Sequence, residues 1–302
     1  DRASYYPGVS EGQLLDKMQV KSQRGFSLLE LMAAVAVLLV ISAAAFSLLN
    51  YFQKNYTSNQ LSADMHSGVR GAIELISQEL TQAGLINSSG VANTSLTSSV
   101  VSSGNSQNVA VGNAGLFYAG ERVSVDTGVN AEVVQVINVD STGNKITGIF
   151  TQNHTTGAPV YATGVIGNGV TVSPGTLDIL GDVNADGSLY LVEYVCDPAT
   201  GTLSRSATPV SQANKNPGQA LVTSVKGCSF SASTAAVNGV SYVTDVALTL
   251  TVQTAQIDPQ TGMHGVMMST FDLSPRNITA AMALAQAGQT VRLQPAPSPL
   301  PQ

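Results

Sequence analysis

The chain has 302 residues, of which 43% are apolar and only 11% are charged, and its formal net charge is −6 at pH 7. A nucleic-acid-binding surface is excluded, because phosphate contacts require a basic face. Full disorder is also excluded, because disordered chains combine low hydrophobicity with high net charge. Three His and two Cys leave little material for a zinc site.

The first informative segment covers residues 26–49, where Glu30 is the only charged residue. About 20 apolar residues span a bilayer as a helix, so this segment is long enough to cross. Lys21 and Arg24 precede it, which favours a cytoplasmic N-terminal side. A secretory signal peptide has a shorter apolar region followed by a small-residue cleavage site. The pattern therefore predicts a single-pass anchor.

Glu30 is unusual because a carboxylate inside an apolar span costs a few kcal/mol and indicates a function. It lies four residues after Phe26, one helical turn away. A cut before Phe26 would create an amine at the start of the helix, and that amine could neutralise a neighbouring carboxylate.

The segment Gly25-Phe26-Ser27-Leu28-Leu29-Glu30 resembles the type IV prepilin cleavage and methylation motif, with a basic leader before it. The resemblance implies that a prepilin peptidase cuts between Gly25 and Phe26 and that Phe26 becomes N-methylated. It also implies that Glu30 pairs with the terminal amine of an adjoining subunit during assembly. Residues 1–25 are then a leader that is removed, and a start at Met18 would give a leader of the family's usual length.

Beyond the apolar segment the pattern becomes amphipathic, which predicts one continuous helix over residues 26–84, with 26–49 in the membrane. At 1.5 Å per residue, the 58 residues from Phe26 to Ala83 would form a helix about 87 Å long. Gly84 is a suitable residue to end it. The stripe that faces a core is formed by Leu61, Met65, Val69, Ala72, Ile76, Leu80 and Ala83.

The remainder is β-rich, so the predicted fold class is α+β: a long N-terminal helix packed on an antiparallel β-sheet domain. Residues 85–105 are expected to be a flexible connection, 106–165 an inserted small β-module and 166–277 the C-terminal β-domain. Residues 278–302 form a tail with a short helix at 278–287 and a Pro-rich, disordered end. In the module, which is either a surface-binding element or a structural elaboration, strands are expected at 116–118, 121–125, 132–139, 145–150 and 160–162.

One loop between two expected strands has the spacing of an EF-hand calcium site. The flanking segments are strand-like rather than helical, so a β-hairpin turn is the alternative, since Asn, Asp and Gly are common turn residues. The sequence therefore leaves two interpretations open, a structural Ca²⁺ site and a plain turn. The candidate ligands are Asp182, Asn184, Asp186, Ser188 and Glu193.

Cys196 and Cys228 are the only cysteines and lie 32 positions apart. On the periplasmic side of a membrane they can oxidise, so a structural disulfide is predicted. A metal or redox-active pair is the alternative, which the wide spacing and the lack of a nearby His disfavour. Residues 66, 154 and 264 are the three His, and a surface or turn position is expected for each.

Three further segments resemble PilW-type minor pilins: residues 76–84, Leu203-Ser204-Arg205 and Pro275-Arg276-Asn277. The resemblance implies a non-enzymatic subunit that primes or joins a type IV pilus. Its implied partners are prepilin peptidase, other minor and major pilins, the inner-membrane assembly platform and the bilayer. It places the protein in the bacterial inner membrane, N-terminus cytoplasmic, and later in a periplasmic or cell-surface pilus.

Three alternatives remain open: a J-type pseudopilin of type II secretion, a pilus-tip adhesin that uses the inserted module, and an anchored periplasmic enzyme. No P-loop, zinc-protease or dinucleotide motif supports the enzyme.

Overall fold

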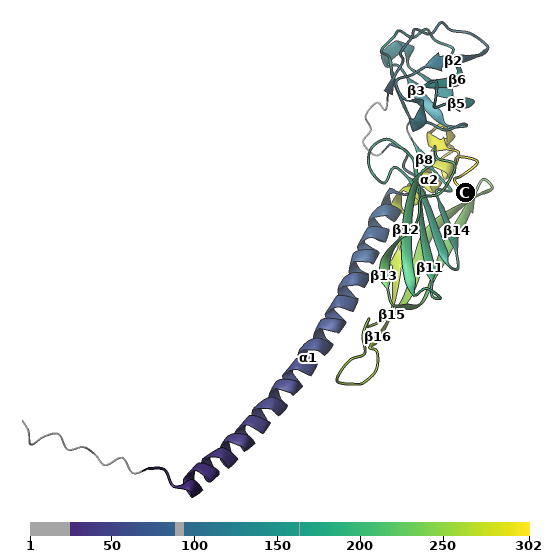
Figure 1. Cartoon of the computed structure of the whole chain (residues 1–302). Helices are drawn as coiled ribbons and strands as arrows, with labels where there is room; N and C mark the ends of the chain where they lie inside the picture. Colours follow the sequence, from purple (N-terminus) through teal and green to yellow (C-terminus); the bar gives the residue numbers. More distant parts are fainter. Residues whose placement is uncertain (1–24, 88–93, 163) are drawn as a thin grey trace, which may run out of the picture. The chain divides into compact units, whose positions relative to one another are not determined.

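The computed structural model describes residues 25–87, 94–162 and 164–302. Apart from Gly25, the predicted leader lies outside the described residues, as do 88–93 of the predicted connection. The chain divides into two compact units, Asp1–Lys54 and Asn55–Gln302, and each is described by itself. Helix α1 (Leu28–Gln82) and a set of antiparallel sheets form the predicted α+β fold (Figure 1).

Within the N-terminal unit, α1 is apolar on all sides. Leu28, Leu39 and Phe46 are more than half exposed, as are most of the large side chains between them. Among the described residues, α1 is the one helix that is long and apolar enough to cross a membrane. Such a surface is stable only when lipid or other apolar helices cover it.

Within the C-terminal unit, α1 buries the predicted stripe. Val69, Ala72, Ile76 and Leu80 are almost completely buried, and Met65 is partly buried against the same core. Their spacing of three and four residues places them on one face of the helix. The helical prediction is therefore confirmed for this part of the chain.

The helix ends at Gln82, and Gly84, two residues later, has a φ of +79° and so adopts the left-handed conformation expected after a helix. The backbone N–H of Gly84 donates to the carbonyl oxygen of Leu180 at 2.6 Å. A Cβ at this position would lie 2.7 Å from the carbonyl oxygen of Ile166. Both the backbone angle and the close approach therefore require glycine here.

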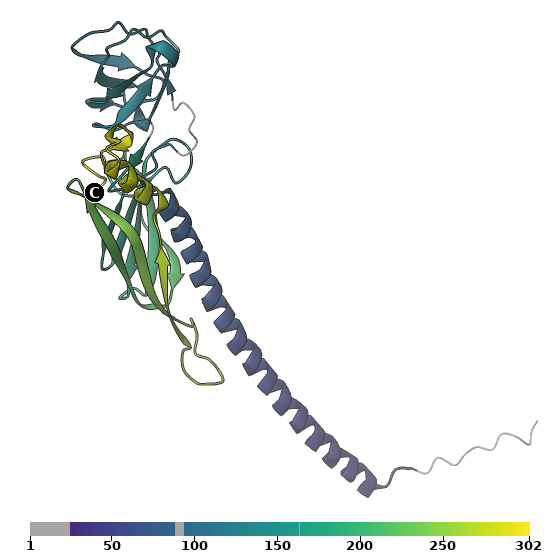
Figure 2. The same ribbon diagram turned by 180° about the vertical axis from the view of Figure 1, so that it is seen from behind.

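The first core lies between α1 and two antiparallel sheets, ordered β13-β12-β11-β10-β9 and β14-β15-β16. These strands lie within residues 166–277, for which the sequence predicts antiparallel β-structure. Figure 2 shows the two sheets from behind. The strands are β9 (Val170–Ser173), β10 (Thr176–Gly181), β11 (Tyr190–Asp197), β12 (Thr202–Pro209), β13 (Gln219–Thr223), β14 (Val225–Val237), β15 (Val240–Gln253) and β16 (Val266–Leu273).

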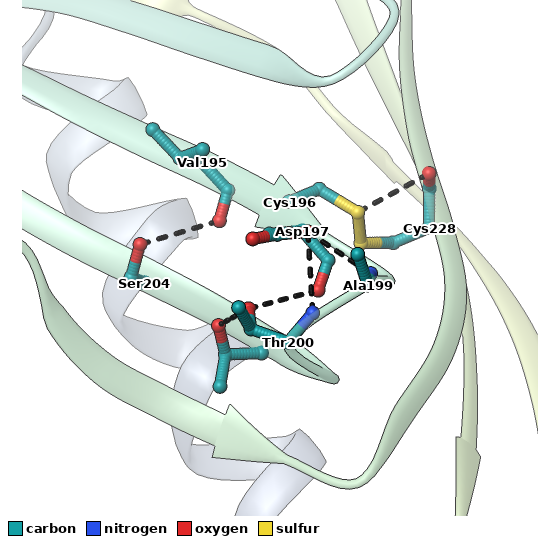
Figure 3. The surroundings of a disulfide bond; sticks show 8 residues. Val195, Cys196, Asp197, Ala199, Thr200, Ser204 and Cys228 are labelled. Carbon is teal, nitrogen blue, oxygen red and sulfur yellow. Dashed lines mark hydrogen bonds between the residues drawn. A yellow bond between two sulfur atoms is a disulfide. The ribbon is translucent and has the colours of Figure 1, made fainter.

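A disulfide between Cys196 on β11 and Cys228 on β14 joins the two sheets, with Cα atoms 6.0 Å apart. Figure 3 shows Cys196 beside the turn that leads to β12, where the Asp197 carboxylate accepts hydrogen bonds from the N–H groups of Ala199 and Thr200. The predicted pairing is present. In the chain-entropy account, closing such a loop stabilises the fold by about 3–4 kcal/mol.

The second core is built mainly by residues 86–166 around two small sheets, ordered β1-β7-β3-β4 and β2-β6-β5. The strands predicted at 121–125, 145–150 and 160–162 are confirmed. The strands are β1 (Thr94–Ser95), β2 (Ser106–Ala110), β3 (Arg122–Val125), β4 (Glu132–Gln135), β5 (Asn138–Asp140), β6 (Lys145–Ile149) and β7 (Pro159–Ala162).

Three expectations for this region are wrong. Residues 116–118 do not form a strand, because a 3₁₀ turn, Ala114–Leu116, is capped by the side chain of Asn113. The strand expected at 132–139 is divided into β4 and β5, which join different sheets. The described part of the connection is not a loose linker, because Leu96 and Val100 are buried in the second core.

The short helix predicted at 278–287 is confirmed, but the Pro-rich end that follows it is held by contacts, contrary to the prediction. After helix α2 (Arg276–Gln286) and a 3₁₀ turn (Thr290–Arg292), strand β17 (Leu293–Gln294) pairs in parallel with β8 (Val165–Ile166). Tyr118 Oη donates to the carbonyl oxygen of Pro295 at 2.8 Å. The Gln294 side chain exchanges two hydrogen bonds with the backbone of Arg122. Contacts distant in sequence therefore hold a segment whose composition alone indicates disorder.

We expect Gly84→Ala to destabilise the chain by about 1–3 kcal/mol, because the new Cβ requires both a strained φ and a shift of the Ile166 carbonyl. Gly71→Ala is the matched control. Gly71 lies in the same helix with open space around it, and alanine is the better helix former there. Thermal unfolding of the full chain in detergent, followed by circular dichroism, measures both; equal melting temperatures would contradict the assigned role of Gly84.

Candidate functional site

The N-terminal motif forms the first turn of α1. Ser27 lies just before the helix, and its Oγ accepts a hydrogen bond from the N–H of Leu29 at 3.3 Å. The Glu30 carboxylate reaches back to the N–H of Ser27 at 3.4 Å. This reciprocal arrangement resembles a capping box, and a negative charge is favourable at a helix N-terminus. The carboxylate is thereby held at the start of the helix.

The bond between Gly25 and Phe26 is accessible. A Cβ at Gly25 would have no atom within 4 Å, and the side chain of Phe26 is 86% exposed. Glu30 lies one turn along the helix, surrounded by exposed leucines on either side in the sequence. The arrangement offers an open backbone bond next to a carboxylate at the edge of an apolar helix. In chemical terms, the carboxylate can neutralise one cationic group there.

A second polar cluster fixes the other end of α1. Glu79 is 5% exposed, and both of its carboxylate oxygens lie 3.0 Å from Nε of Arg205 on β12. A second nitrogen of the guanidinium also donates to the carboxylate, which makes the ion pair bidentate. Tyr194 on β11 donates its hydroxyl to the same carboxylate. We call Glu79, Tyr194 and Arg205 the helix-anchoring triad.

The pKa shifts of Tyr194 and Arg205 both favour the protonated forms that donate to Glu79. Burial, followed by the charge of Glu79, raises the pKa of Tyr194, so its hydroxyl remains a donor. The hydrogen bonds with Glu79 raise the pKa of Arg205 despite its partial burial. Tyr194 and Arg205 are also directly opposite each other on neighbouring strands. One carboxylate from the helix is therefore satisfied by two cross-strand partners.

The triad brings together segments that are far apart in the sequence. Glu79 lies within residues 76–84, and Arg205 ends the segment Leu203-Ser204-Arg205. The third such segment also reaches this end of α1, because Nδ2 of Asn277 donates to the carbonyl oxygen of Thr81 at 2.7 Å. Sequence reasoning did not identify the ion pair. A glutamate within an otherwise apolar helical face and a lone arginine within a strand were the available signals.

Of the two interpretations that the sequence leaves open for the loop at 182–193, the described contacts are those of a turn. Asp182 accepts hydrogen bonds from the N–H groups of Asp186 and Gly187, and Asp186 accepts from Ser188. Glu193, the required final ligand, instead forms an ion pair with Lys215 at 3.0 Å. In the part of the chain that the structure describes, no group of three or more His, Cys, Asp or Glu side chains is placed to hold a metal ion. The turn interpretation accounts for the loop.

The expectation for His154 is also wrong, because this residue is 2% exposed and lies between two carboxylates. Its Nδ1 is 3.2 Å from Asp126 and its Nε2 is 2.7 Å from Glu132. Burial raises the pKa of Glu132, but hydrogen bonds from Thr151 and His154 outweigh it and lower the pKa overall. The cluster joins Asp126, which follows β3, Glu132 at the start of β4 and the loop that carries His154.

The comparisons with known proteins concern the N-terminal segment. Residues 20–46 match the family model of the prokaryotic N-terminal methylation motif. The chain is thus type IV pilin-like in this segment, and the motif family is structural rather than enzymatic. No curated protein and no solved structure matches the chain. Together with the apolar helix, the motif indicates a membrane anchor and an association with pilus-type assemblies.

We expect Glu79→Leu to lower the free energy of unfolding by about 3 kcal/mol, because it leaves the Arg205 charge and the Tyr194 hydroxyl without their partner. The variant Glu79→Leu/Tyr194→Phe/Arg205→Met removes all three polar groups and should recover most of that loss. Chemical denaturation of the full chain in detergent measures both. A loss below about 1 kcal/mol for the single variant would show that the triad does not anchor the helix.

Proposed function

We propose that this chain is a minor pilin, a structural subunit that joins or primes a type IV pilus after cleavage and N-methylation. The observation that carries the proposal is the position of the Glu30 carboxylate, one turn after an exposed Gly25–Phe26 bond on a helix that is apolar all round. Such a helix, inserted in the inner membrane, is a substrate for prepilin peptidase and for the assembly platform.

The proposed mechanism is lateral association of apolar helices. After cleavage, the new amine at Phe26 of one subunit and the Glu30 carboxylate of its neighbour attract each other strongly, because an apolar environment screens charge poorly. The pairing selects one axial register among many that apolar packing alone would permit. The C-terminal unit then contacts other minor and major pilins in the periplasm or in the surface pilus.

The narrower assignment to PilW-type minor pilins is supported by the place where the three similar segments meet. All three lie at the C-terminal end of α1, two of them through the helix-anchoring triad and one through Asn277. A J-type pseudopilin of type II secretion has the same plan. Neighbouring genes distinguish the two, since pilus genes support the minor pilin and secretion genes contradict it.

Cleavage gives the first test. Mass spectrometry of the protein purified from its native membrane should show a mature chain that begins with N-methylated Phe26. The variant Gly25→Leu should keep residues before position 26, because its side chain obstructs the bond that the peptidase must approach. A mature N-terminus elsewhere would contradict the proposal.

Assembly gives the second test. Glu30→Ala should be cleaved normally but incorporated into filaments about tenfold less or worse, which corresponds to about 1.4 kcal/mol. Glu74→Ala is the matched control, since Glu74 is an exposed glutamate on the same helix outside the apolar segment. Immunoblotting of sheared filaments against whole cells measures incorporation. Equal incorporation of the two variants would exclude the charge-pairing role.

A further inference from the structure

One hollow of the C-terminal unit combines an aliphatic lining with two arginines. It has a volume of about 360 Å³, which lies within the range of small-molecule pockets in proteins. We call it the arginine pocket, after Arg122 and Arg292, which line it. A smaller hollow of about 210 Å³ adjoins it, because Arg122, Val133 and Val291 line both.

The first wall of the arginine pocket is the outer face of the sheet that contains β3 and β4. Val123 and Val125 of β3 are completely buried in the second core. Alternation along the strand therefore directs Arg122 and Ser124 to the opposite face. Ser124 is directly opposite Val133 on β4, so these two residues share that face. Arg122, Ser124 and Val133 thus converge on one pocket, which all three line.

The second wall is formed by the segment that runs from α2 to β17. Leu284 of α2 lines the pocket, as do Val291 and Arg292 of the following 3₁₀ turn. Gly164, beside β8, allows this segment to approach closely. It has a φ of +116°, and a Cβ at this position would collide with the carbonyl oxygen of Arg292. Side chains from two distant parts of the chain therefore face each other across the pocket.

The guanidinium of Arg122 is held in place by one of its nitrogens. Nη1 donates to the carbonyl oxygen of Thr290 at 3.3 Å and to that of Leu293 at 2.5 Å. Among the described residues, Nε and Nη2 of Arg122 have no hydrogen-bond partner. The same two nitrogens of Arg205 form the bidentate contact with Glu79. A carboxylate is therefore the group that fits the unoccupied edge of this guanidinium.

Both cations of the arginine pocket lack a carboxylate partner. In the part of the chain that the structure describes, His154, Arg205 and Lys215 form the ion pairs, and neither Arg122 nor Arg292 belongs to one. Of the described residues that line the pocket, none is acidic. The chain as a whole has a net charge of −6, so two unpaired guanidinium groups side by side form a local site of positive potential that attracts an anion.

The apolar lining of the pocket is aliphatic, and Leu85, Val165 and Leu284 contribute to it. An alkyl chain that covers these side chains is removed from water, which favours binding. We propose that the arginine pocket binds a small aliphatic carboxylate. Its carboxylate contacts Nε and Nη2 of Arg122 and the guanidinium of Arg292, and its alkyl chain lies against the leucine and valine side chains.

Two other kinds of anion fit the pocket less well. An inorganic anion such as phosphate or sulfate satisfies the arginines but leaves the aliphatic lining exposed to water. The carboxylate side chain of another protein has only a short alkyl stem, which covers a small part of that lining. An aliphatic carboxylate satisfies both the charge and the apolar surface of the pocket, and the binding experiment separates these two contributions.

The test is equilibrium dialysis of radiolabelled octanoate against the full-length protein in detergent, with detergent alone as the reference. Octanoate should bind at one site per chain. Unlabelled octanamide has the same alkyl chain without the charge, and acetate has the charge without the chain. Each should compete at least about tenfold more weakly than unlabelled octanoate. Absence of octanoate binding above the reference would overturn the proposal, and so would equal competition by octanamide or by acetate.

Two arginine variants locate the ligand. Arg292→Gln removes an exposed charge, and Arg122→Lys keeps the charge but removes the planar fork; each should weaken octanoate binding at least about fivefold. Arg276→Gln is the matched control, because Arg276 is an exposed residue at the start of α2 and does not line the pocket. Thermal unfolding midpoints close to wild type show that the variants are folded. Wild-type affinity in both Arg292→Gln and Arg122→Lys would exclude this site.

A third pair of variants tests the sign of the charge. Val133 is 56% exposed at the pocket, so a polar side chain is tolerated there. Val133→Glu adds a carboxylate that repels the ligand, whereas Val133→Gln has nearly the same shape without the charge. Octanoate should bind at least about fivefold more weakly to Val133→Glu than to Val133→Gln. Equal affinities would show that the pocket does not recognise an anion.

Discussion

The buried carboxylate of Glu79 fixes the long helix against the sheets. The first half of α1 is apolar on every side, so its side chains do not determine how the helix is rotated about its axis. The second half has an apolar stripe, which restricts rotation but permits sliding along the sheet. The bidentate contact with Arg205 and the contact with Tyr194 allow only one position, because any displacement leaves a buried charge unpaired.

The features that could be predicted from the sequence are those encoded locally. The apolar segment, the stripe from Met65 to Leu80 and the terminal Gly84 all depend on residues within a few helical turns. The strands around residues 176–205 follow from alternation between turn residues. The motif at Gly25–Glu30 could also be identified, because its meaning depends on spacing within one turn and on an uninterrupted apolar segment.

The features that could not be predicted depend on contacts between distant segments. The Pro-rich tail has the composition of a disordered end, but Tyr118 and Arg122 hold it from positions far earlier in the chain. The partner of Glu79 lies 126 residues away, and local periodicity says nothing about it. The loop at Asp182–Glu193 matches a ligand pattern in spacing alone, but Glu193 lies within a strand and binds Lys215. Spacing cannot show which way a strand presents its side chains.

The segments that connect the first core to the second core affect how the structure responds to force. Three stretches of chain meet between the cores: residues 84–86, β8 and β17, joined by backbone hydrogen bonds and by the Arg122–Gln294 contacts. An insertion is usually tethered by its two ends alone, and those ends carry all the tension when it is pulled. Here the C-terminal strand adds a third attachment in parallel with the other two. A force applied to the inserted region is therefore shared, and rupture requires several hydrogen bonds to break together rather than one after another.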